Sequence, residues 1–238
     1  MAIVSQSQLD RLFEQAHSNY LNEAAFYTHL LQAMVFAHVP VSDDARSHRL
    51  IQFRHPDGFD ATPVFTSAQR CARAASSAVK LIQLPCIELF KATRGATLMI
   101  NPNDGGPVLY PEEITALLEK GILEPLEKLE PAGGSWDVRP AQNPSKHVVE
   151  AVRAGAHSAS FIRHVYLLEK REMGSEELVL LVYVGVESGH LERAGRYMVQ
   201  VLQDLQPRSE TVMDVAVYDS ALPRPAFLDE LGAVPVLG

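Results

Sequence analysis

Apolar residues follow two kinds of pattern along this chain, and its second half shows both clearly. The uninterrupted apolar run from Leu178 to Val186 is typical of a central strand that is covered on both faces. The segment from about Gly189 to Leu205 repeats apolar residues at helical spacing, which predicts an amphipathic helix with one core-facing side. That side carries Leu191, Ala194, Met198, Val201, Leu202 and Leu205.

The rest of the second half predicts further elements on either side of these two. A helix is expected over residues 144–154, strands over 160–168 and 211–218, and a short last helix near 227–231. The resulting order is α-β-β-α-β-α. Strands and helices mix here without a strict βαβ alternation, which favours an α+β fold over a doubly wound sheet.

The first half alternates short apolar segments with helix-start signals. Thr66 and Ser67 come before an alanine-rich helix, where a hydroxyl side chain is a good N-cap. Pro85 and Pro111 are each well placed to begin a helix, because the first turn does not need their missing N–H. Strands are predicted over residues 34–39, 49–53, 79–84 and 98–100. The whole chain is therefore predicted to be α+β, with two domains that are each a mixed sheet covered by helices.

Prolines and glycines recur over residues 125–143 and interrupt any regular element there. This composition predicts a linker between an N-terminal domain, residues 1–124, and a C-terminal domain, residues 144–238. Trp136, the only tryptophan, lies within the predicted linker. A large aromatic side chain in such a segment is expected to pack between domains or to stack on a ligand.

Composition excludes several classes of function for this 238-residue chain. The net charge is −8, so a basic surface for nucleic acid or anionic lipid is not expected. The start of the chain lacks the features of a secretory signal, and no stretch approaches the roughly 18 apolar residues that cross a bilayer. Two cysteines are too few for a disulfide framework. We expect a cytoplasmic protein that contacts neither nucleic acid nor membrane.

The most distinctive short stretch is a loop that contains Asn101, Asn103, Asp104, Gly105 and Gly106. As a ligand or partner loop, it would use glycines to expose backbone N–H groups and Asp104 to bind a hydroxyl or a cation. As a tight turn, its Asn and Asp side chains would hydrogen-bond their own backbone. The loop lacks the glycine spacing of a phosphate-binding motif, so a phosphate cradle is not expected.

The two cysteines invite thiol chemistry but have a simpler explanation. Cys86 follows Pro85 at a predicted helix start, where the helix dipole would lower a thiol pKa. Its neighbours are apolar, however, and Cys71 stands next to alanine on a helix. Because free cysteine commonly behaves as a small buried hydrophobe, we expect both thiols to be buried and inert.

The nine histidines show no zinc-binding spacing, and the sequence predicts no metal or other cofactor. His55, Asp57 and Asp60 share one loop that resembles a surface turn more than a cation site. His164 alternates with other residues on a predicted strand, which favours a partly buried histidine bonded to a neighbour. Ser67 is better explained as a helix cap than as a nucleophile. No catalytic site is predicted.

Three segments resemble the N-terminal domain of the bacterial enhanced serine sensitivity (SseB) family. They are Pro63–Ser67 before a helix, Leu98–Pro102, and Tyr110–Ile114 at a helix start, in the family's order. The resemblance covers roughly residues 20–122, and the part from about 144 onward is similar to the family's C-terminal domain by element order. The family is cytoplasmic and is named for altered tolerance to serine, which implies no particular reaction.

These observations favour a non-catalytic binding or regulatory protein that acts through a protein partner or a small metabolite such as an amino acid. The first alternative is a homo-oligomeric assembly protein, and the sequence leaves the oligomeric state open. The second is an enzyme with an unrecognised site, with thiol chemistry at Cys86 or a hydrolytic site near Asp104.

Overall fold

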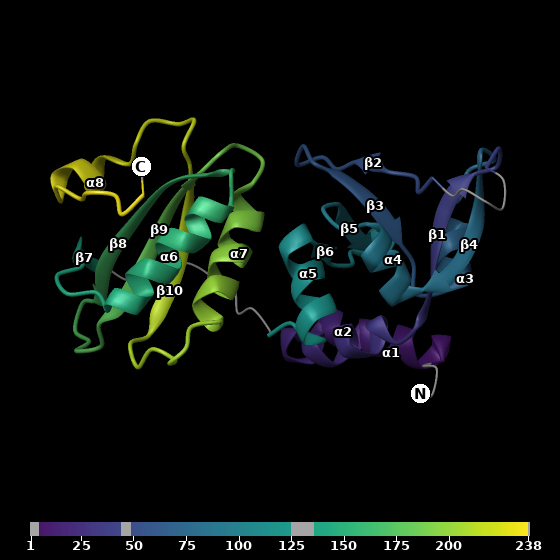
Figure 1. Ribbon diagram of the computed structural model, residues 1–238, viewed down its shortest axis with the longest axis horizontal. Helices are drawn as coiled ribbons and strands as arrows, with labels where there is room; N and C mark the ends of the chain where they lie inside the picture. Colours follow the sequence, from purple (N-terminus) through teal and green to yellow (C-terminus); the bar gives the residue numbers. More distant parts are fainter. Residues whose placement is uncertain (1–4, 44–48, 125–135, 238) are drawn as a thin grey trace. The chain divides into compact units, whose positions relative to one another are not determined.

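The computed structural model describes residues 5–43, 49–124 and 136–237. The chain forms two compact units, Met1–Glu127 and Lys128–Gly238, and each is considered by itself. Helices and strands occur in both units, and the strands form three sheets, so the predicted α+β class is confirmed (Figure 1).

The first unit begins with helices and then alternates strands with short helices. Two sheets form within it, where the sequence predicted one: an antiparallel pair β1-β4 and a four-stranded sheet of order β2-β3-β5-β6. Its elements are α1 (Gln6–Ser18), η1 (Tyr20–Asn22), α2 (Glu23–Leu31), β1 (Met34–Pro40), β2 (Phe53–Arg54), β3 (Asp60–Val64), α3 (Ala68–Arg73), β4 (Val79–Pro85), α4 (Cys86–Ala92), β5 (Thr97–Ile100), η2 (Pro102–Asp104), β6 (Val108–Leu109) and α5 (Pro111–Lys120).

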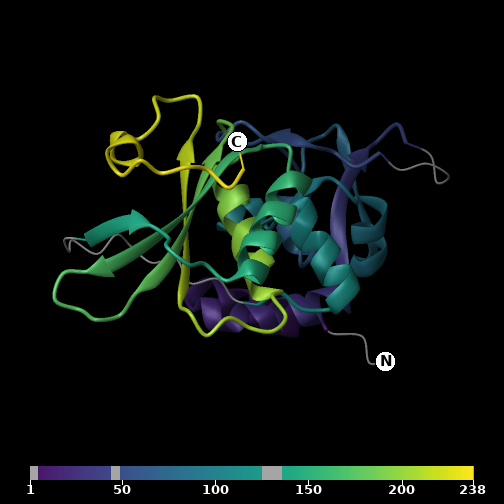
Figure 2. The ribbon, with the colours of Figure 1, turned by 60° about the vertical axis from the view of Figure 1, so that its left-hand side comes forward.

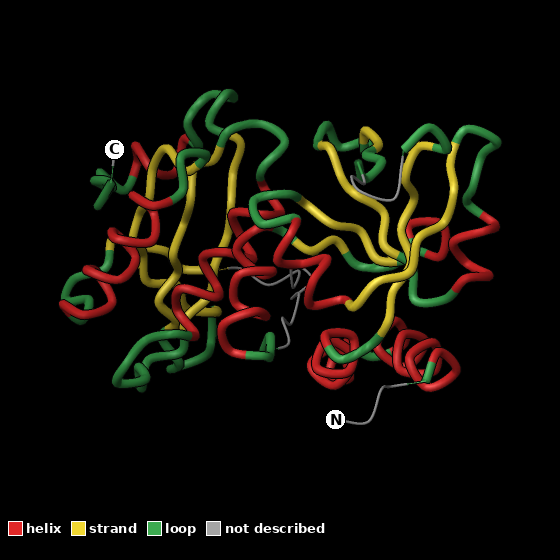
Figure 3. Tube along the Cα trace, turned by 45° about the vertical axis from the view of Figure 1, so that its right-hand side comes forward, coloured by secondary structure: helices red, strands yellow, loops and turns green. Residues whose placement is uncertain are grey.

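The two sheets of the first unit meet at an isolated bridge between Phe36 of β1 and Phe65, directly after β3. Helices α1 and α2 pack side by side and bury Phe13 and Phe26 edge to face (Figure 3). The core between these helices and the strands is continuous and almost entirely apolar. Burial of this apolar surface is the main favourable contribution to the stability of the unit.

The second unit contains one four-stranded sheet of order β10-β9-β8-β7, in which only β10 and β9 are parallel. Helices α6 and α7 cover one face, and α8 packs on the other (Figure 2). Strand β9 is thus buried on both faces, as its apolar sequence predicts. The elements are β7 (Trp136–Pro140), α6 (Lys146–Ser158), β8 (Ile162–Glu172), β9 (Val179–Val186), α7 (Leu191–Gln203), β10 (Met213–Asp219) and α8 (Ala226–Glu230).

Strand β7 corrects the predicted linker. Residues 125–135 lie outside the described residues, but Trp136–Pro140 pairs with β8 and belongs to the second sheet. Proline made this segment resemble a linker, although an edge strand tolerates proline because half of its N–H groups have no strand partner. Trp136 is 38% exposed, and the Lys170 ammonium lies 4.6 Å from the centroid of its ring. The indole therefore contacts its own sheet.

Gly185 lies in the middle of β9, between His164 on β8 and Tyr218 on β10. A Cβ atom at this glycine would lie only 2.6 Å from the ring of Tyr218. The missing side chain therefore lets the tyrosine ring lie directly over the strand backbone. A lone glycine within a strand often marks such a close approach.

Both cysteines are buried in the first unit, as predicted. Cys86 begins α4 inside the main core, and Cys71 lies on α3 beside Phe36 and Phe65; neither is exposed to solvent. Burial raises the pKa of the Cys71 thiol to about 12 and raises the pKa of Cys86 as well. Both residues are therefore neutral thiols at physiological pH, and only thiolates are good nucleophiles.

We expect neither thiol to react with a water-soluble disulfide reagent at pH 8 while the protein is folded. Both should react in a denaturant, because unfolding exposes them and restores an ordinary thiol pKa. Absorbance of the released thiolate measures the two rates. Rapid labelling of one thiol per folded chain would contradict the buried placement.

Two glycine substitutions test the packing over β9. Gly185→Ala should destabilise the protein by about 1–3 kcal/mol, because the added methyl displaces the Tyr218 ring. Gly195→Ala on α7 is the matched control, since its methyl meets Val217 at 3.6 Å and alanine favours a helix by about 0.5–1 kcal/mol. Urea unfolding measures both changes. Equal stabilisation by the two alanines would contradict the close approach.

Candidate functional site

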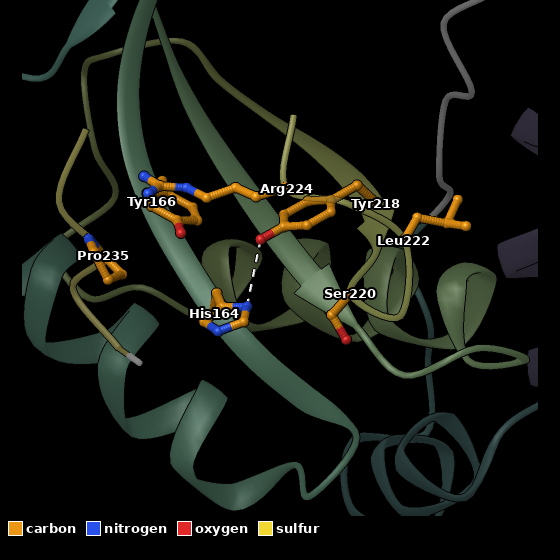
Figure 4. A pocket seen from close by; sticks show the side chains of 7 residues that line it. All are labelled: His164, Tyr166, Tyr218, Ser220, Leu222, Arg224 and Pro235. Atoms are coloured by element: carbon orange, nitrogen blue, oxygen red, sulfur yellow. Dashed lines mark hydrogen bonds between the residues drawn. The ribbon is translucent and has the colours of Figure 1, made fainter. Parts of the chain in front are cut away.

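A pocket of about 320 Å³ opens in the second unit, on the same side of the sheet as α8. Figure 4 shows the side chains that surround it. Two belong to β8, one to β10, three to the segment that follows β10, and one to the C-terminal segment after α8. They are His164, Tyr166, Tyr218, Ser220, Leu222, Arg224 and Pro235.

Strand geometry explains why three of these side chains meet. His164 and Tyr166 are two residues apart on β8, so both point to the same face of the sheet. The pairing of β8, β9 and β10 aligns His164, Gly185 and Tyr218 in one row across the sheet. Because Gly185 has no side chain, the Tyr218 hydroxyl reaches the Nδ1 atom of His164 at 3.4 Å (Figure 4).

Tyr218 is a neutral phenol at physiological pH, as tyrosine ordinarily is. Burial raises the pKa of its hydroxyl, and the nearby hydroxyls of Tyr166 and Tyr183 raise it further, while the Arg224 cation opposes them. The ring of Tyr183 also stacks on the Tyr218 ring, with centroids 5.0 Å apart. A neutral phenol both donates and accepts a hydrogen bond, so Tyr218 offers both functions at the pocket.

Arg224 supplies a full positive charge at the pocket. Its Nη2 atom donates to the Ala233 carbonyl oxygen at 2.7 Å, and its Nη1 atom lies 2.7 Å from an Asp229 carboxylate oxygen. The guanidinium carbon lies 5.3 Å from the centroid of the Tyr166 ring. The side chain of Arg224 nevertheless stays 39% exposed. The guanidinium is therefore oriented by the fold and still open to solvent.

Hydrogen bonds fix the segment that follows β10. The backbone N–H and the hydroxyl of Ser220 both donate to the Val186 carbonyl oxygen, at 2.8 and 2.9 Å. The Asp219 carboxylate accepts from the Ser188 hydroxyl at 2.7 Å and from the Ala221 N–H at 2.9 Å. Because the Ser220 proton is directed at a carbonyl, the hydroxyl oxygen keeps only its acceptor capacity for other groups. This part of the pocket is preorganised by backbone contacts.

The predicted loop at residues 101–106 lies in the first unit, and Asn101 supports the fold there. Its side chain is buried, with φ 45° and ψ 60° in the left-handed region that asparagine tolerates. The side-chain oxygen accepts from the Thr66 N–H at 3.0 Å, and the amide nitrogen donates to the Thr66 hydroxyl at 3.0 Å. The loop is thus tied to the end of β3.

The other residues of this loop differ in their surroundings. Asp104 forms ion pairs with Arg70 and Arg73 of α3. Gly106 is buried, and a Cβ there would lie 1.8 Å from the Ile100 carbonyl oxygen, so any larger residue is excluded. Asn103 and Gly105 are exposed. Hydrogen bonds, ion pairs and close packing within the unit therefore account for Asn101, Asp104 and Gly106. A ligand or partner role for the loop stays a prediction.

Residues 5–43, 49–124 and 136–237 contain neither a metal-binding cluster nor a helix that could cross a membrane. No group of three or more His, Cys, Asp or Glu side chains in these ranges is placed to hold a metal ion. Near the proposed His–Asp loop, the Asp57 N–H donates to His55 Nδ1 at 3.2 Å, and Asp60 pairs with Arg54 at 3.3 Å. Within the same ranges, every helix is too short or too polar to cross a bilayer.

His164 is partly buried and bonded to a neighbour, as its strand position predicts, but the pocket around it was not predicted from the sequence. Two signals were present: a single glycine inside an apolar strand, and the cluster Pro223–Pro225 directly after a strand. Neither signal specifies that the register across β9 brings Tyr218 to His164. That juxtaposition depends on long-range strand pairing, which local patterns do not reveal.

Comparison with known proteins agrees with the resemblance seen in the sequence. Residues 9–116 match the model of the SseB protein N-terminal domain. Protein SseB of Escherichia coli (strain K12) and Protein SseB of Shigella flexneri are each 22% identical to this chain over 218 residues. Each match covers 87% of this chain and 83% of the relative. Residues 9–116 therefore resemble the SseB protein N-terminal domain, and over most of its length the chain is similar to SseB proteins.

Proposed function

We propose that this protein is a non-catalytic binding protein that recognises a small metabolite in the pocket of its second unit. The observation that carries the proposal is the meeting of three different polar groups at one cavity: a neutral phenol, an imidazole and a guanidinium, from Tyr218, His164 and Arg224. Ligand sites characteristically combine apolar walls with a few converging polar groups. A volume of about 320 Å³ suits a metabolite of modest size.

The chemistry of the surrounding groups favours binding over catalysis. Nucleophilic catalysis needs a hydroxyl or thiol aimed at a base, which a third group orients. Ser220 instead donates its proton to the Val186 carbonyl, and the Cys86 thiol is enclosed in the core of the first unit. The proposal places this binding protein in the cytoplasm. An amino acid is one candidate ligand, because the family resemblance links these proteins to serine tolerance.

The proposal predicts that a larger side chain at the opening of the pocket reduces ligand binding. Leu222 lines the pocket and is 64% exposed, so Leu222→Trp should fill the opening without disturbing the core. We expect the full-length protein to retain at least one compound from a mixture of the standard amino acids, organic acids, sugars and nucleosides. Leu222→Trp should reduce retention at least roughly 10-fold, because it removes ligand contact area. Equilibrium dialysis with mass spectrometry measures retention.

Val212→Trp is the matched control, because Val212 is 52% exposed in the same unit and does not line the pocket. It should bind the retained compound as the unmodified protein does. Retention of no compound, or an equal loss in both tryptophan variants, would contradict the proposed site. Circular dichroism confirms that both variants are folded.

A further inference from the structure

The pocket differs in charge from the chain as a whole. The full sequence carries a net charge of −8, so a negatively charged small molecule is repelled by the molecule's average field. Among the residues that the structure describes, the pocket lining contains the guanidinium of Arg224 and the imidazole of His164 but no carboxylate. The counter-charge of Arg224 is the Asp229 carboxylate, which lies outside this lining. A cation entering the pocket therefore meets the guanidinium and no carboxylate in the described lining. An anion meets a group of opposite charge, the Arg224 guanidinium.

Arg224 retains capacity to bind such an anion. A guanidinium has five N–H donors in a planar fork. One contact of Arg224 goes to the Ala233 carbonyl and another to Asp229, whose side chain is 62% exposed. Exposed ion pairs contribute little to stability, so a ligand carboxylate can replace Asp229 or join it at the remaining donors. Carboxylates are the natural partners of this fork, because two parallel hydrogen bonds can form.

The apolar and aromatic part of the lining determines which ligands fit beside Arg224. Leu222 and Pro235 present apolar atoms, and the tyrosine rings at positions 166 and 218 add aromatic surface. The Tyr218 hydroxyl offers a second hydrogen-bonding group beside His164. A compact apolar or aromatic body with a carboxylate at one end satisfies both parts of the lining. A phosphate-rich nucleotide would leave most of its charges facing these apolar walls.

We propose that the ligand of this pocket is a small carboxylate anion with a compact apolar or aromatic body, bound by Arg224 at its carboxylate. This inference rests on the proposed function, since it names the ligand class for the same site. It also assigns Asp229 a role as the intramolecular carboxylate that occupies the Arg224 fork while no ligand is bound.

Three probes of similar size differ chiefly in charge: benzoate, benzamide and benzylamine, which are anionic, neutral and cationic at pH 7. We expect saturable binding of benzoate to the full-length protein by isothermal titration or NMR. Benzamide and benzylamine should bind at least roughly 10-fold more weakly, because charge-assisted bonds to a guanidinium are stronger than neutral ones. Benzoate affinity should also fall as salt is added, since the contact is electrostatic and partly exposed.

Charge variants identify the binding group. Arg224→Met should weaken benzoate binding at least roughly 10-fold. Arg171→Met, which removes a somewhat more exposed charge at the far end of β8, should leave benzoate binding unchanged. Asp229→Asn should strengthen benzoate binding several-fold, because it removes the competing carboxylate. Asp229 is mostly exposed, so this variant remains informative even if Arg224→Met proves unstable.

The outcomes distinguish this inference from the proposed function. Equal binding of the three probes, preference for benzylamine, or unchanged benzoate affinity in Asp229→Asn and Arg224→Met would overturn the carboxylate assignment. The pocket would remain a binding site if the dialysis experiment still retained a neutral or cationic compound in a Leu222-dependent way. If none of the probes binds and dialysis retains nothing, both the ligand class and the proposed function are wrong.

Discussion

The shape of the second unit at its pocket depends on the absence of one side chain. Tyr218 lies over β9 at Gly185, and a methyl group there would lie 2.6 Å from its ring. The same gap brings the tyrosine hydroxyl to His164, and partial burial there raises the pKa of the phenol. Core packing leaves little free space in proteins, so one such gap is enough to determine where a large aromatic ring lies. The proposed binding chemistry follows from this placement.

The first unit uses its most distinctive sequence features for a different purpose. Thr66 donates to Asp10 at 2.5 Å and exchanges hydrogen bonds with Asn101, while Arg70 contacts both Asp10 and Asp104. These contacts join α1, the start of α3 and the loop after β5. Because the polar groups are partly buried, leaving any of them unpaired would be costly. Two of the three segments that resemble the family pattern, Pro63–Ser67 and Leu98–Pro102, therefore contribute to the polar network that holds this unit together.

Much of the fold was predictable because its signals are local. The apolar stripe of α7 and the continuous run of β9 each specify their element without reference to the rest of the chain. Local signals failed at β7, where prolines and glycines suggested a linker although Trp136–Pro140 pairs with β8. They also could not reveal the pocket, because residues 164, 185 and 218 meet only through strand register. The loop at residues 101–106 stood out in sequence for reasons that its packing largely explains.

Side-chain NMR of the tyrosine and histidine rings tests the central claim most directly, because it reports where a ligand binds. The account predicts that added benzoate shifts the ring signals of Tyr218 and His164 together and saturably, as expected for groups 3.4 Å apart at one site. The signal of Tyr20, which lies in the first unit, should not move. Unchanged signals from both pocket residues, or equal shifts at Tyr20, would contradict the account.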